Sequence, residues 1–255
     1  MKFNYIGLWT LIKKEIKRTG KIVNQVIWPP IISMLLYSFV FGISLGSSIK
    51  ELEGVPYLHF LIPGLIMMSI IDNSFNEGSA SLFISKFLNS LQDILAAPLS
   101  SLEIIGGYIL GGVIRGVSIG TLIYLVSKIF LKYSISHYFL FIAFMAIVSV
   151  IFASIGTIIA LWAEDFDQLA VLSTFFITPL IFFGGVFHSV NMLPPLLQKI
   201  SLFNPLFYMI DGFRYSIVEV SIVPVMRSLG IVSVIAVVSF VAAYMLFNSG
   251  YKIKS

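Results

Sequence analysis

The amino-acid sequence predicts an all-α integral membrane protein with six transmembrane helices, and two observations support this fold class. Hydrophobic residues make up 58% of the 255 positions and charged residues only 11%, whereas a soluble domain is about one quarter charged. Six stretches stay apolar for roughly the 20 residues that a helix needs to cross a bilayer. Together they use most of the chain, so we expect residues 1–255 to form a single transmembrane domain without a soluble catalytic unit.

The chain opens with an amphipathic segment over residues 1–25. Its apolar arc holds Tyr5, Trp9, Ile12 and Ile16, and its basic side holds Lys13, Lys14, Lys17 and Lys21. The two faces separate when residues are placed about 100° apart, as in a helix. The pattern predicts an interface helix whose lysines meet anionic lipid headgroups and whose aromatic rings enter the acyl boundary. An ordinary solvated helix is the alternative, and we do not read the lysines as a nucleic-acid site.

Six apolar segments follow in order. We predict transmembrane helices at Val26–Gly46, Tyr57–Ser74, Ile104–Ser127, Phe139–Ala163, Leu169–Phe187 and Leu229–Phe247. Pro29 and Pro30 stand near the start of the first one, where a missing backbone donor costs least. Pro63-Gly64 predicts a kink in the second, and a neighbouring helix must satisfy the carbonyl that this proline frees.

An even number of crossings places both termini on the same side of the membrane. The positive-inside rule assigns that side to the cytoplasm, since the terminal segments and the connection after the second span hold nine of the 16 Lys and Arg residues. The connections that would lie outside hold six of them. The first apolar run starts near Val26 without a small-residue cleavage site, so we expect no cleaved signal peptide.

The connection after the second span, residues 76–103, contains a predicted amphipathic helix on the inner side. Its apolar face is formed by Phe83, Ile84, Phe87, Leu88, Leu91, Ile94 and Leu95. The opposite face is polar, and Pro98 ends the helix because the residue before a proline avoids the α conformation. A membrane pore has no need for such a cytoplasmic apolar stripe, whereas a docking surface for a partner protein requires one.

The connection before the last span, residues 189–228, is divided by Leu193-Pro194-Pro195 and by Asn204-Pro205. Each apolar piece is about half a span length or slightly more, which is too short to cross a bilayer. We therefore predict a split re-entrant hairpin that dips into the outer leaflet or lies along it. Asp211 and Arg214 stand one helical turn apart in its second piece, a spacing that allows an ion pair.

Small residues recur in the third span. Gly107 and Gly111 stand four residues apart, and Gly112, Gly116 and Gly120 continue the pattern on an adjacent face. Such faces let helices approach each other closely. Three interpretations remain open, namely packing inside one subunit, a dimer seam and a contact that moves.

Ionisable residues are almost absent from the predicted spans, and the notable exceptions are Arg115 and Asp72. A membrane-embedded charge is costly, so Arg115 needs a partner, and Asp72 is the nearest candidate by depth. An ion pair that holds the spans together is the first interpretation, and a direct role in substrate passage is the second. Ion-coupled carriers usually place several carboxylates or broken helices at mid-membrane, so an ion-coupled pump is disfavoured.

The chain lacks the motifs of common catalytic and metal sites. A phosphate-binding loop needs Gly-Lys followed by Ser or Thr, and the one Gly-Lys pair, Gly20-Lys21, does not meet this requirement. His59, His137 and His188 are far apart in the sequence, and there is no cysteine, so no metal-ligand spacing is present. We therefore expect no catalytic residue, no metal and no cofactor bound by this chain.

Several short motifs occur in order along nearly the whole chain. They are Pro63-Gly64-Leu65-Ile66-Met67-Met68-Ser69, Ala96-Ala97-Pro98-Leu99, Gly107-Tyr108 with Arg115-Gly116, Thr178-Pro179-Leu180 with Gly184-Gly185-Val186-Phe187, Leu193-Pro194-Pro195, and Asn204-Pro205 with Tyr208 and Phe213-Arg214-Tyr215. Together with the basic amphipathic start and the split hairpin, they resemble the permease subunits of type-2 ABC exporters. Within that family, the chain resembles the YadH-like group of bacterial inner-membrane permeases.

This resemblance implies a homodimer of permeases with two copies of a separate cytoplasmic ABC ATPase, which would bind the ATP and Mg²⁺. The coupling helix that docks in the ATPase would be formed by Ile84, Phe87, Leu88, Leu91, Ile94 and Leu95. Spans one, two and five would line the transport route. The outer hairpin, with Asn204, Pro205, Tyr208, Asp211 and Arg214, would be the lid of that route. The location would be the bacterial inner membrane, with both termini in the cytoplasm.

The leading hypothesis is therefore a permease subunit, not an enzyme, of an ATP-driven exporter that moves a lipid-like, glycoconjugate or drug-like amphiphile. A pore or scaffold that acts without a nucleotide-binding partner is the alternative. The two hypotheses differ in whether an ATPase docks on the inner amphipathic helix.

Overall fold

Helices form most of the structure. It is a computed structural model that describes residues 3–44, 46 and 49–252. The α-helices are α1 (Tyr5–Lys21), α2 (Val23–Ser44), α3 (Tyr57–Phe87), α4 (Ser90–Ala96), α5 (Ser101–Phe130), α6 (Tyr138–Trp162), α7 (Phe166–Leu172), α8 (Thr178–Phe183), α9 (Pro195–Phe203), α10 (Pro205–Val218) and α11 (Val225–Asn248). A π-helical segment, Ser173–Ile177, joins α7 to α8, and a short 3-10 turn, Val190–Met192, precedes α9. Strands β1 (Glu51–Leu52) and β2 (Val55–Pro56) add a small antiparallel hairpin to the helical fold.

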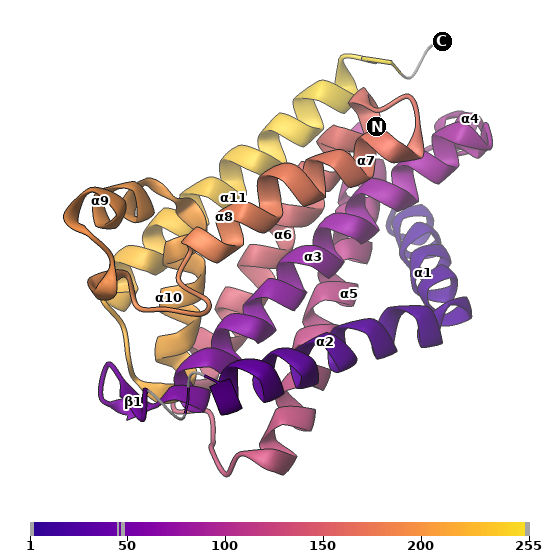
Figure 1. The fold of residues 1–255 in the computed structure, drawn as a ribbon. Coiled ribbons are helices and arrows are strands. Elements are labelled where there is room, and N and C mark those ends of the chain that lie inside the picture. The colour runs from indigo at the N-terminus through magenta and orange to yellow at the C-terminus, as the bar shows by residue number, and fades with distance from the viewer. Residues whose placement is uncertain (1–2, 45, 47–48, 253–255) are drawn as a thin grey trace.

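Six helical runs among the described residues are long and apolar enough to cross a membrane, which confirms the predicted fold class. They are α2, α3, α5, α6, the run from α7 to α8, and α11. α3 and α6 are largely buried at the centre, whereas α2 and α11 expose most of their surface. In Figure 1, α4 and the two chain ends lie toward one end of the bundle, the terminal end, and β1 and α9 lie toward the other, the hairpin end.

α3 is longer than predicted, because it continues past Ser74 to Phe87. Asn89, with a positive φ of 58°, separates it from α4. The added turns pack closely on α6, since a Cβ on Gly78 would lie only 2.4 Å from the carbonyl oxygen of Ala153. The predicted single amphipathic helix after the second span is therefore wrong. Its first part belongs to α3, and only α4 is a separate helix.

α2 begins at Val23, earlier than predicted, and this changes the position of its prolines. Pro29 and Pro30 lie inside the helix rather than at its start. A proline inside a helix cannot donate to the carbonyl four residues earlier, so the carbonyl oxygens of Gln25 and Val26 lose their usual helical donors. The predicted placement, where the missing donors cost least, is therefore wrong.

The fifth span, Phe166–Phe183, lies a few residues earlier than predicted and is not a regular α-helix throughout. It ends at Phe183 rather than Phe187, because Gly184 and Gly185 turn the chain and Gly185 has a φ of 83°. Its middle, Ser173–Ile177, winds as a π-helix, a form that is frequent at functional sites. α5, α6 and α11 agree with the predicted spans to within a few residues.

The split hairpin before the last span is confirmed as two short helices, α9 and α10. Pro195 and Pro205 are their first residues, a position where a proline removes no helical hydrogen bond. The Asn204 side chain caps α10 by accepting the N–H of Leu206 at 3.0 Å. α10 is buried against α3, α6 and α11 rather than standing alone. Its placement relative to the outer leaflet stays a prediction.

α1 packs along α5 at two of the glycines of the third span. Leu11 lies over Gly107 and Glu15 over Gly111, where an added Cβ would come within 2.5 Å and 3.0 Å of their side chains. Gly112, Gly116 and Gly120 of the same span pack against α3 and α6. These contacts support the first of the three open interpretations, packing inside one subunit.

The predicted amphipathic helix at the start of the chain is confirmed as α1, but its buried face differs from the prediction. The exposed side chains include Tyr5, Trp9, Lys13, Ile16 and Lys17. Ile12 is buried instead, together with Leu11 and Glu15, because α1 turns this face toward the bundle. The predicted contact of the exposed aromatic side chains with the membrane surface stays a prediction.

Candidate functional site

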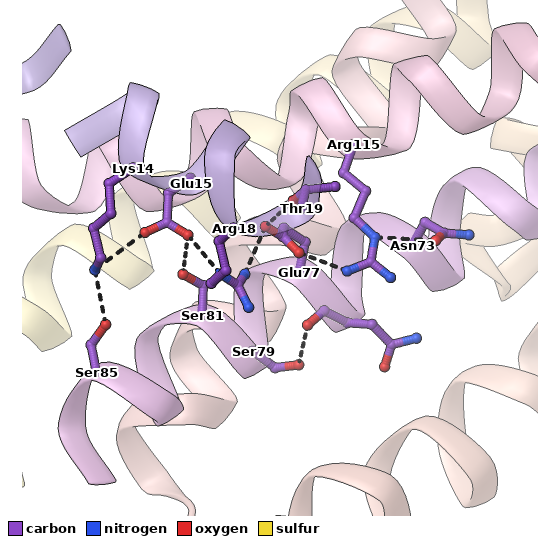
Figure 2. Close-up of polar contacts among 11 residues, drawn as sticks. Lys14, Glu15, Arg18, Thr19, Asn73, Glu77, Ser79, Ser81, Ser85 and Arg115 are labelled. Carbon is purple, nitrogen blue, oxygen red and sulfur yellow. Dashed lines mark hydrogen bonds and ion pairs between the residues drawn. The ribbon is translucent and has the colours of Figure 1, made fainter. Parts of the chain in front are cut away.

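Two buried carboxylates, Glu15 of α1 and Glu77 of α3, lie where α1, α3 and α5 meet (Figure 2). Each side chain is only 1% exposed. Glu77 pairs with two arginines from different helices, through Nη2 of Arg18 at 2.7 Å and Nη1 of Arg115 at 2.7 Å. The hydroxyl of Thr19 also donates to this carboxylate at 3.0 Å. A single carboxylate therefore joins three helices.

Glu15 extends this arrangement along α1. Its carboxylate lies 3.5 Å from Nζ of Lys14 and 3.2 Å from Nε of Arg18, and it accepts a hydrogen bond from the hydroxyl of Ser81. We define the Glu77 network as Lys14, Glu15, Arg18, Thr19, Glu77 and Arg115. Removing one partner of a buried ion pair costs about 3–5 kcal/mol, so loss of either carboxylate would weaken the contact of α1 with the bundle.

The predicted ion pair between Arg115 and Asp72 is wrong. The partner of Arg115 is Glu77, and its Nε also donates to Oδ1 of Asn73 at 3.3 Å. Asn73 and Glu77 are four residues apart and share the face of α3 that α5 covers, whereas Asp72 lies on the neighbouring face. The sequence did not indicate Glu77 as a partner of Arg115, because Glu77 falls in the predicted cytoplasmic connection. The feature that could have identified Glu77 is the helix-forming sequence that continues beyond Ser74, the predicted end of the span.

A cavity of about 320 Å³, which we call the central cavity, lies between α2, α3 and α5. Its polar lining comprises Gln25, Ser33, Tyr37, Ser69, Asp72, Asn73, Asn76 and Arg115. On α3, Ser69, Asp72 and Asn76 recur at helical spacing and give one face of an apolar span a polar stripe. Ligand pockets commonly measure about 300–1,000 Å³, so the central cavity is large enough for a small polar group.

Two opposite charges line the central cavity without pairing with each other. Arg115 uses Nε and Nη1 in its bonds to Asn73 and Glu77, and its Nη2 has no hydrogen-bond partner among the described residues. The Asp72 carboxylate likewise makes no hydrogen bond or ion pair with another described residue. Ionisable side chains inside membrane-spanning helices often mark functional sites. The cavity can therefore offer a ligand one group of each sign.

An apolar cleft of about 400 Å³ adjoins the central cavity between α1, α2 and α5. Its apolar lining comprises Ile16, Val23, Val26, Ile27, Ile114, Ile119 and Leu122. Val26 and Arg115 line both spaces, so the cavity and the cleft share a wall. In Figure 1, α1 and α2 diverge from their common turn. The polar central cavity and the apolar cleft therefore meet at Arg115.

The predicted docking face around α4 is divided between the interior and the surface. Leu91 is 3% exposed and packs inside the chain, so it is a core residue rather than a docking residue. Ile84 and Ile94 are half-buried. Phe87 and Leu88, by contrast, are 63% and 65% exposed. The break at Asn89 explains the division, because α3 and α4 do not share one continuous helical face.

An exposed apolar patch remains on the surface of this region. We define it as Phe87, Leu88, Leu95 and Phe166. Phe166, at the start of α7, stacks edge-on with Phe87, with ring centres 5.6 Å apart. Exposed polar residues of α4, Gln92 and Asp93, lie beside the patch in the sequence. The sequence alone did not connect Phe166 with this surface, because it follows a different span.

Arg214 of α10 is buried at the hairpin end without an ion pair among the described residues. Its Nε donates to the carbonyl of Phe60 at 3.1 Å and its Nη2 to the carbonyl of Gly185 at 2.6 Å. The guanidinium carbon lies 3.7 Å from the centre of the Phe60 ring. We define the Arg214 cluster as Arg214, Phe60 and Gly185.

The predicted ion pair between Asp211 and Arg214 is also wrong. Asp211 accepts two backbone N–H groups of the loop before α11, at 3.0 Å and 3.1 Å. Backbone N–H groups in a buried loop need hydrogen-bond acceptors, and those of Ile222 and Val223 take up the Asp211 carboxylate, whereas Arg214 donates to backbone carbonyls. Pro63 removes the helical donor of the His59 carbonyl rather than that of Phe60, so the expected support of the freed carbonyl by a neighbouring helix stays a prediction.

Motifs that lie far apart in the sequence meet beside the Arg214 cluster. A Cβ on Gly64 would lie 3.0 Å from Cα of Val186, and the hydroxyl of Tyr57 donates to the carbonyl of Phe187 at 3.0 Å. Further along the hairpin, the side-chain amide of Asn204 donates to a carbonyl of α8 at 2.6 Å. Tyr208 donates to the last turn of α9 at 2.9 Å. The predicted role of this region as a lid stays a prediction.

Comparison with known proteins finds relatives along the whole chain. The sequence pattern of the family described as ABC-2 type transporter matches residues 7–218. Inner membrane transport permease YadH of Escherichia coli strain K12 is 36% identical over 256 residues, covering 100% of both chains. Nodulation protein J of Rhizobium meliloti strain 1021 is 25% identical over 240 residues, covering 93% of this chain and 90% of that protein. Nodulation protein J of Rhizobium leguminosarum bv. viciae is 27% identical over 211 residues, covering 82% and 81%.

Proposed function

The chain belongs to the ABC-2 type transporter family, and on that premise we propose that it is the permease subunit of an ATP-driven exporter for a lipid-like, glycoconjugate or drug-like amphiphile. As a transport permease with six apolar helical runs, it is a multi-pass protein of the inner membrane. The family implies a separate ATPase partner. Our proposal adds that two ATPase copies bind the ATP and Mg²⁺, that the permease is a homodimer, and that both termini face the cytoplasm.

The observation that carries this proposal is the exposed apolar patch at the terminal end of the bundle. The patch lies where α3 ends and α4 begins, near the two chain ends (Figure 1). With the termini in the cytoplasm, these side chains face water rather than hydrocarbon. Exposed large apolar side chains beside polar residues, two of them in contact here, are typical of a protein interaction site. The patch therefore supports docking of the ATPase at this place.

The central cavity and the apolar cleft support an amphiphilic cargo. Both spaces are lined by α2, the first of the spans expected to line the route, and the central cavity is also lined by α3, the second. One space is lined by amide, hydroxyl and charged groups, and the other mainly by aliphatic side chains. An amphiphile carries both kinds of surface. Outward transport is the direction that we propose.

A homodimer is supported by the apolar surface that α2 and the fifth span leave uncovered. The most exposed large side chains of this surface are Trp28, Leu36, Phe39, Phe175 and Phe176. α2 also contributes one wall of the central cavity. A second copy of the chain on this side would bring two central cavities near each other.

The test is co-purification of the permease with its ATPase. The permease carries the affinity tag and is co-expressed with the ATPase encoded beside it, as wild type, Leu88→Asp and Leu196→Asp. Leu88 belongs to the exposed apolar patch, and Leu196 is a matched exposed leucine of α9 at the hairpin end. Placing a charge in an apolar contact costs several kcal/mol, so we expect Leu88→Asp to lose at least about tenfold of the bound ATPase.

Wild type and Leu196→Asp are both expected to retain the ATPase, and wild type is expected to show cargo-dependent ATP hydrolysis. Failure of the wild type to bind any ATPase would reject the exporter subunit and favour the partner-independent pore or scaffold. Equal retention by both variants would move the docking site away from the patch. Reporter fusions at either end of the chain test the cytoplasmic termini separately.

A further inference from the structure

We propose that the central cavity and the apolar cleft form one composite binding site for an amphiphile with a zwitterionic head group. This inference rests on the proposed function and narrows its cargo class. The head group occupies the central cavity, with its anion at Arg115 and its cation at Asp72. The alkyl chain lies in the apolar cleft, which borders the central cavity at Val26 and Arg115.

The charge pattern of the central cavity selects a ligand of both signs. Glu77 is already paired with two arginines, so it does not cancel the attraction of Arg115 for an anion. The unpartnered Nη2 of Arg115 can donate to a phosphate or carboxylate oxygen, a strong charge-assisted bond. The unpartnered carboxylate of Asp72 can accept from an ammonium group. A ligand with only one charge would leave the other side chain unsatisfied.

The α2 wall of the central cavity adds two features that suit an ammonium group. Tyr37 lines the cavity, and the face of an aromatic ring attracts a nearby cation. Pro29 and Pro30 remove the helical donors of two carbonyl groups on the preceding turn, at Gln25 and Val26. All four of these α2 residues also line the cavity. Two carbonyl groups that lack helical donors therefore belong to residues that line the cavity on its α2 side.

The apolar cleft suits an alkyl chain because its wall is mainly aliphatic and it borders the cavity at two shared residues. Ile114 and Val26 lie close to Arg115 on α5 and α2. The cleft is bounded by α1, α2 and α5, and Ile16 and Val23 at its rim are each 42% exposed. A chain that enters between α1 and α2 would reach the shared wall with its head group beside Arg115.

The experiment measures photolabelling of the full-length permease, without ATPase, in nanodiscs of anionic phosphatidylglycerol. Four probes share the same alkyl chain with a photoreactive group near its end. Their head groups are phosphocholine, phosphate, trimethylammonium and maltoside. We expect the phosphocholine probe to label the cleft helices most strongly and in a saturable manner. Labelled positions are mapped by mass spectrometry.

Two variants test the head-group contacts. Asp72→Asn is expected to lower phosphocholine labelling about tenfold and to shift the preference to the phosphate probe, because only the cation contact is lost. Glu77→Gln combined with Arg115→Gln removes the arginine together with its carboxylate partner, and it is expected to shift the preference to trimethylammonium. Asp167→Asn, a change at an exposed carboxylate outside the cavity, should leave the labelling unchanged.

A third variant tests the chain contact. Ile114→Trp fills part of the apolar cleft and is expected to reduce labelling by every probe without changing the order of the head groups. Equal labelling by all four probes, or labelling that does not saturate, would overturn the proposal in favour of bulk lipid. Preference for maltoside would overturn it in favour of a hydroxyl-rich ligand. Because no ATPase is present, these outcomes are independent of whether an ATPase docks.

Discussion

The Glu77 network holds two half-buried arginines and the Arg214 cluster one buried arginine, and the two regions satisfy the positive charge in different ways. In the network, Arg18 and Arg115 meet the carboxylate of Glu77 from two separate helices. In the cluster, Arg214 meets two backbone carbonyls and the face of an aromatic ring. A carboxylate on a side chain can exchange partners when helices move, whereas a backbone carbonyl in a packed turn holds its position.

This difference assigns the two ends of the bundle different mechanical properties. At the hairpin end, Arg214 joins α3, α10 and the glycine turn at Gly185 into one rigid unit. At the terminal end, α1 is held by side-chain ion pairs and by the contacts of Leu11 and Glu15 with glycines of α5. The exposed apolar patch lies at the same end. A partner that docks there would act on the region whose contacts are easiest to rearrange.

The largest expected effect is the removal of the shared carboxylate. Glu77→Leu leaves Arg18 and Arg115 without a common partner, so the free energy of unfolding should fall by about 3–5 kcal/mol. Unfolding is measured by denaturant titration in mixed micelles. Glu51→Leu, at an exposed carboxylate of β1, should change it by less than about 0.5 kcal/mol. Similar values for the two variants would contradict the importance of the network.

Replacing arginine by lysine sharpens the comparison between the two regions. Arg214→Lys loses the planar fork and the ring contact, so it should lower the free energy of unfolding by about 2–3 kcal/mol. Arg115→Lys keeps a positive charge for Glu77 and should cost only about 1 kcal/mol. The same titration measures both variants. A larger loss of unfolding free energy for Arg115→Lys than for Arg214→Lys would show that the network, not the cluster, depends on guanidinium geometry.

A smaller effect is expected where α1 meets α5. Gly107→Ala places a Cβ 2.5 Å from a methyl carbon of Leu11, and the flexible leucine can move aside only in part. We expect a cost of about 1–3 kcal/mol and faster proteolysis within α1. Gly20→Ala is the matched control, because nothing lies within 4 Å of its added Cβ. Loss of stability in the control instead would indicate a backbone effect rather than helix contact.

The smallest effect is expected at the exposed pair of Glu164 and Lys252, which lie 2.6 Å apart beyond the ends of α6 and α11. The hydrogen bond from Lys252 lowers the pKa of the Glu164 carboxyl, and the same bond raises the pKa of Lys252. Any stability that Glu164 contributes is present above its unfolded pKa and is lost as the pH falls through its folded pKa. The contribution of Lys252 is lost only as the pH rises through its raised pKa.

Because both groups are exposed to water and salt, Glu164→Gln should leave the unfolding midpoint at pH 7 unchanged within error. The pKa itself is the sensitive readout. Lys252→Gln should raise the pKa of Glu164 toward its ordinary value, as measured by NMR titration of the labelled carboxyl. An unchanged pKa would mean that the pair does not form. Its contrast with Glu77 tests whether burial, rather than pairing, gives an ion pair its strength.

Local patterns predicted much of this molecule correctly. The six spans, the amphipathic start and the two short helices before the last span follow from runs of apolar residues, helical spacing and prolines, all of which are properties of short segments. The motifs of the chain also placed it among the ABC permeases before any contact was known. The extent of α3 was underestimated, because polar residues such as Asn76 and Glu77 are unusual in a span.

The sequence by itself determined the membrane class, the number of spans and the family. Length, hydropathy and the order of motifs can be read along the chain without knowing which residues are in contact. Only the tertiary structure decided that Arg115 pairs with Glu77 rather than Asp72, that Leu91 is buried, and that Arg214 binds backbone carbonyls. Those outcomes depend on how each helix is rotated and which helix faces it. The rotation of each helix is set by packing over the whole bundle, for example by the close approach of Gly78 to Ala153. A local sequence pattern does not specify such contacts.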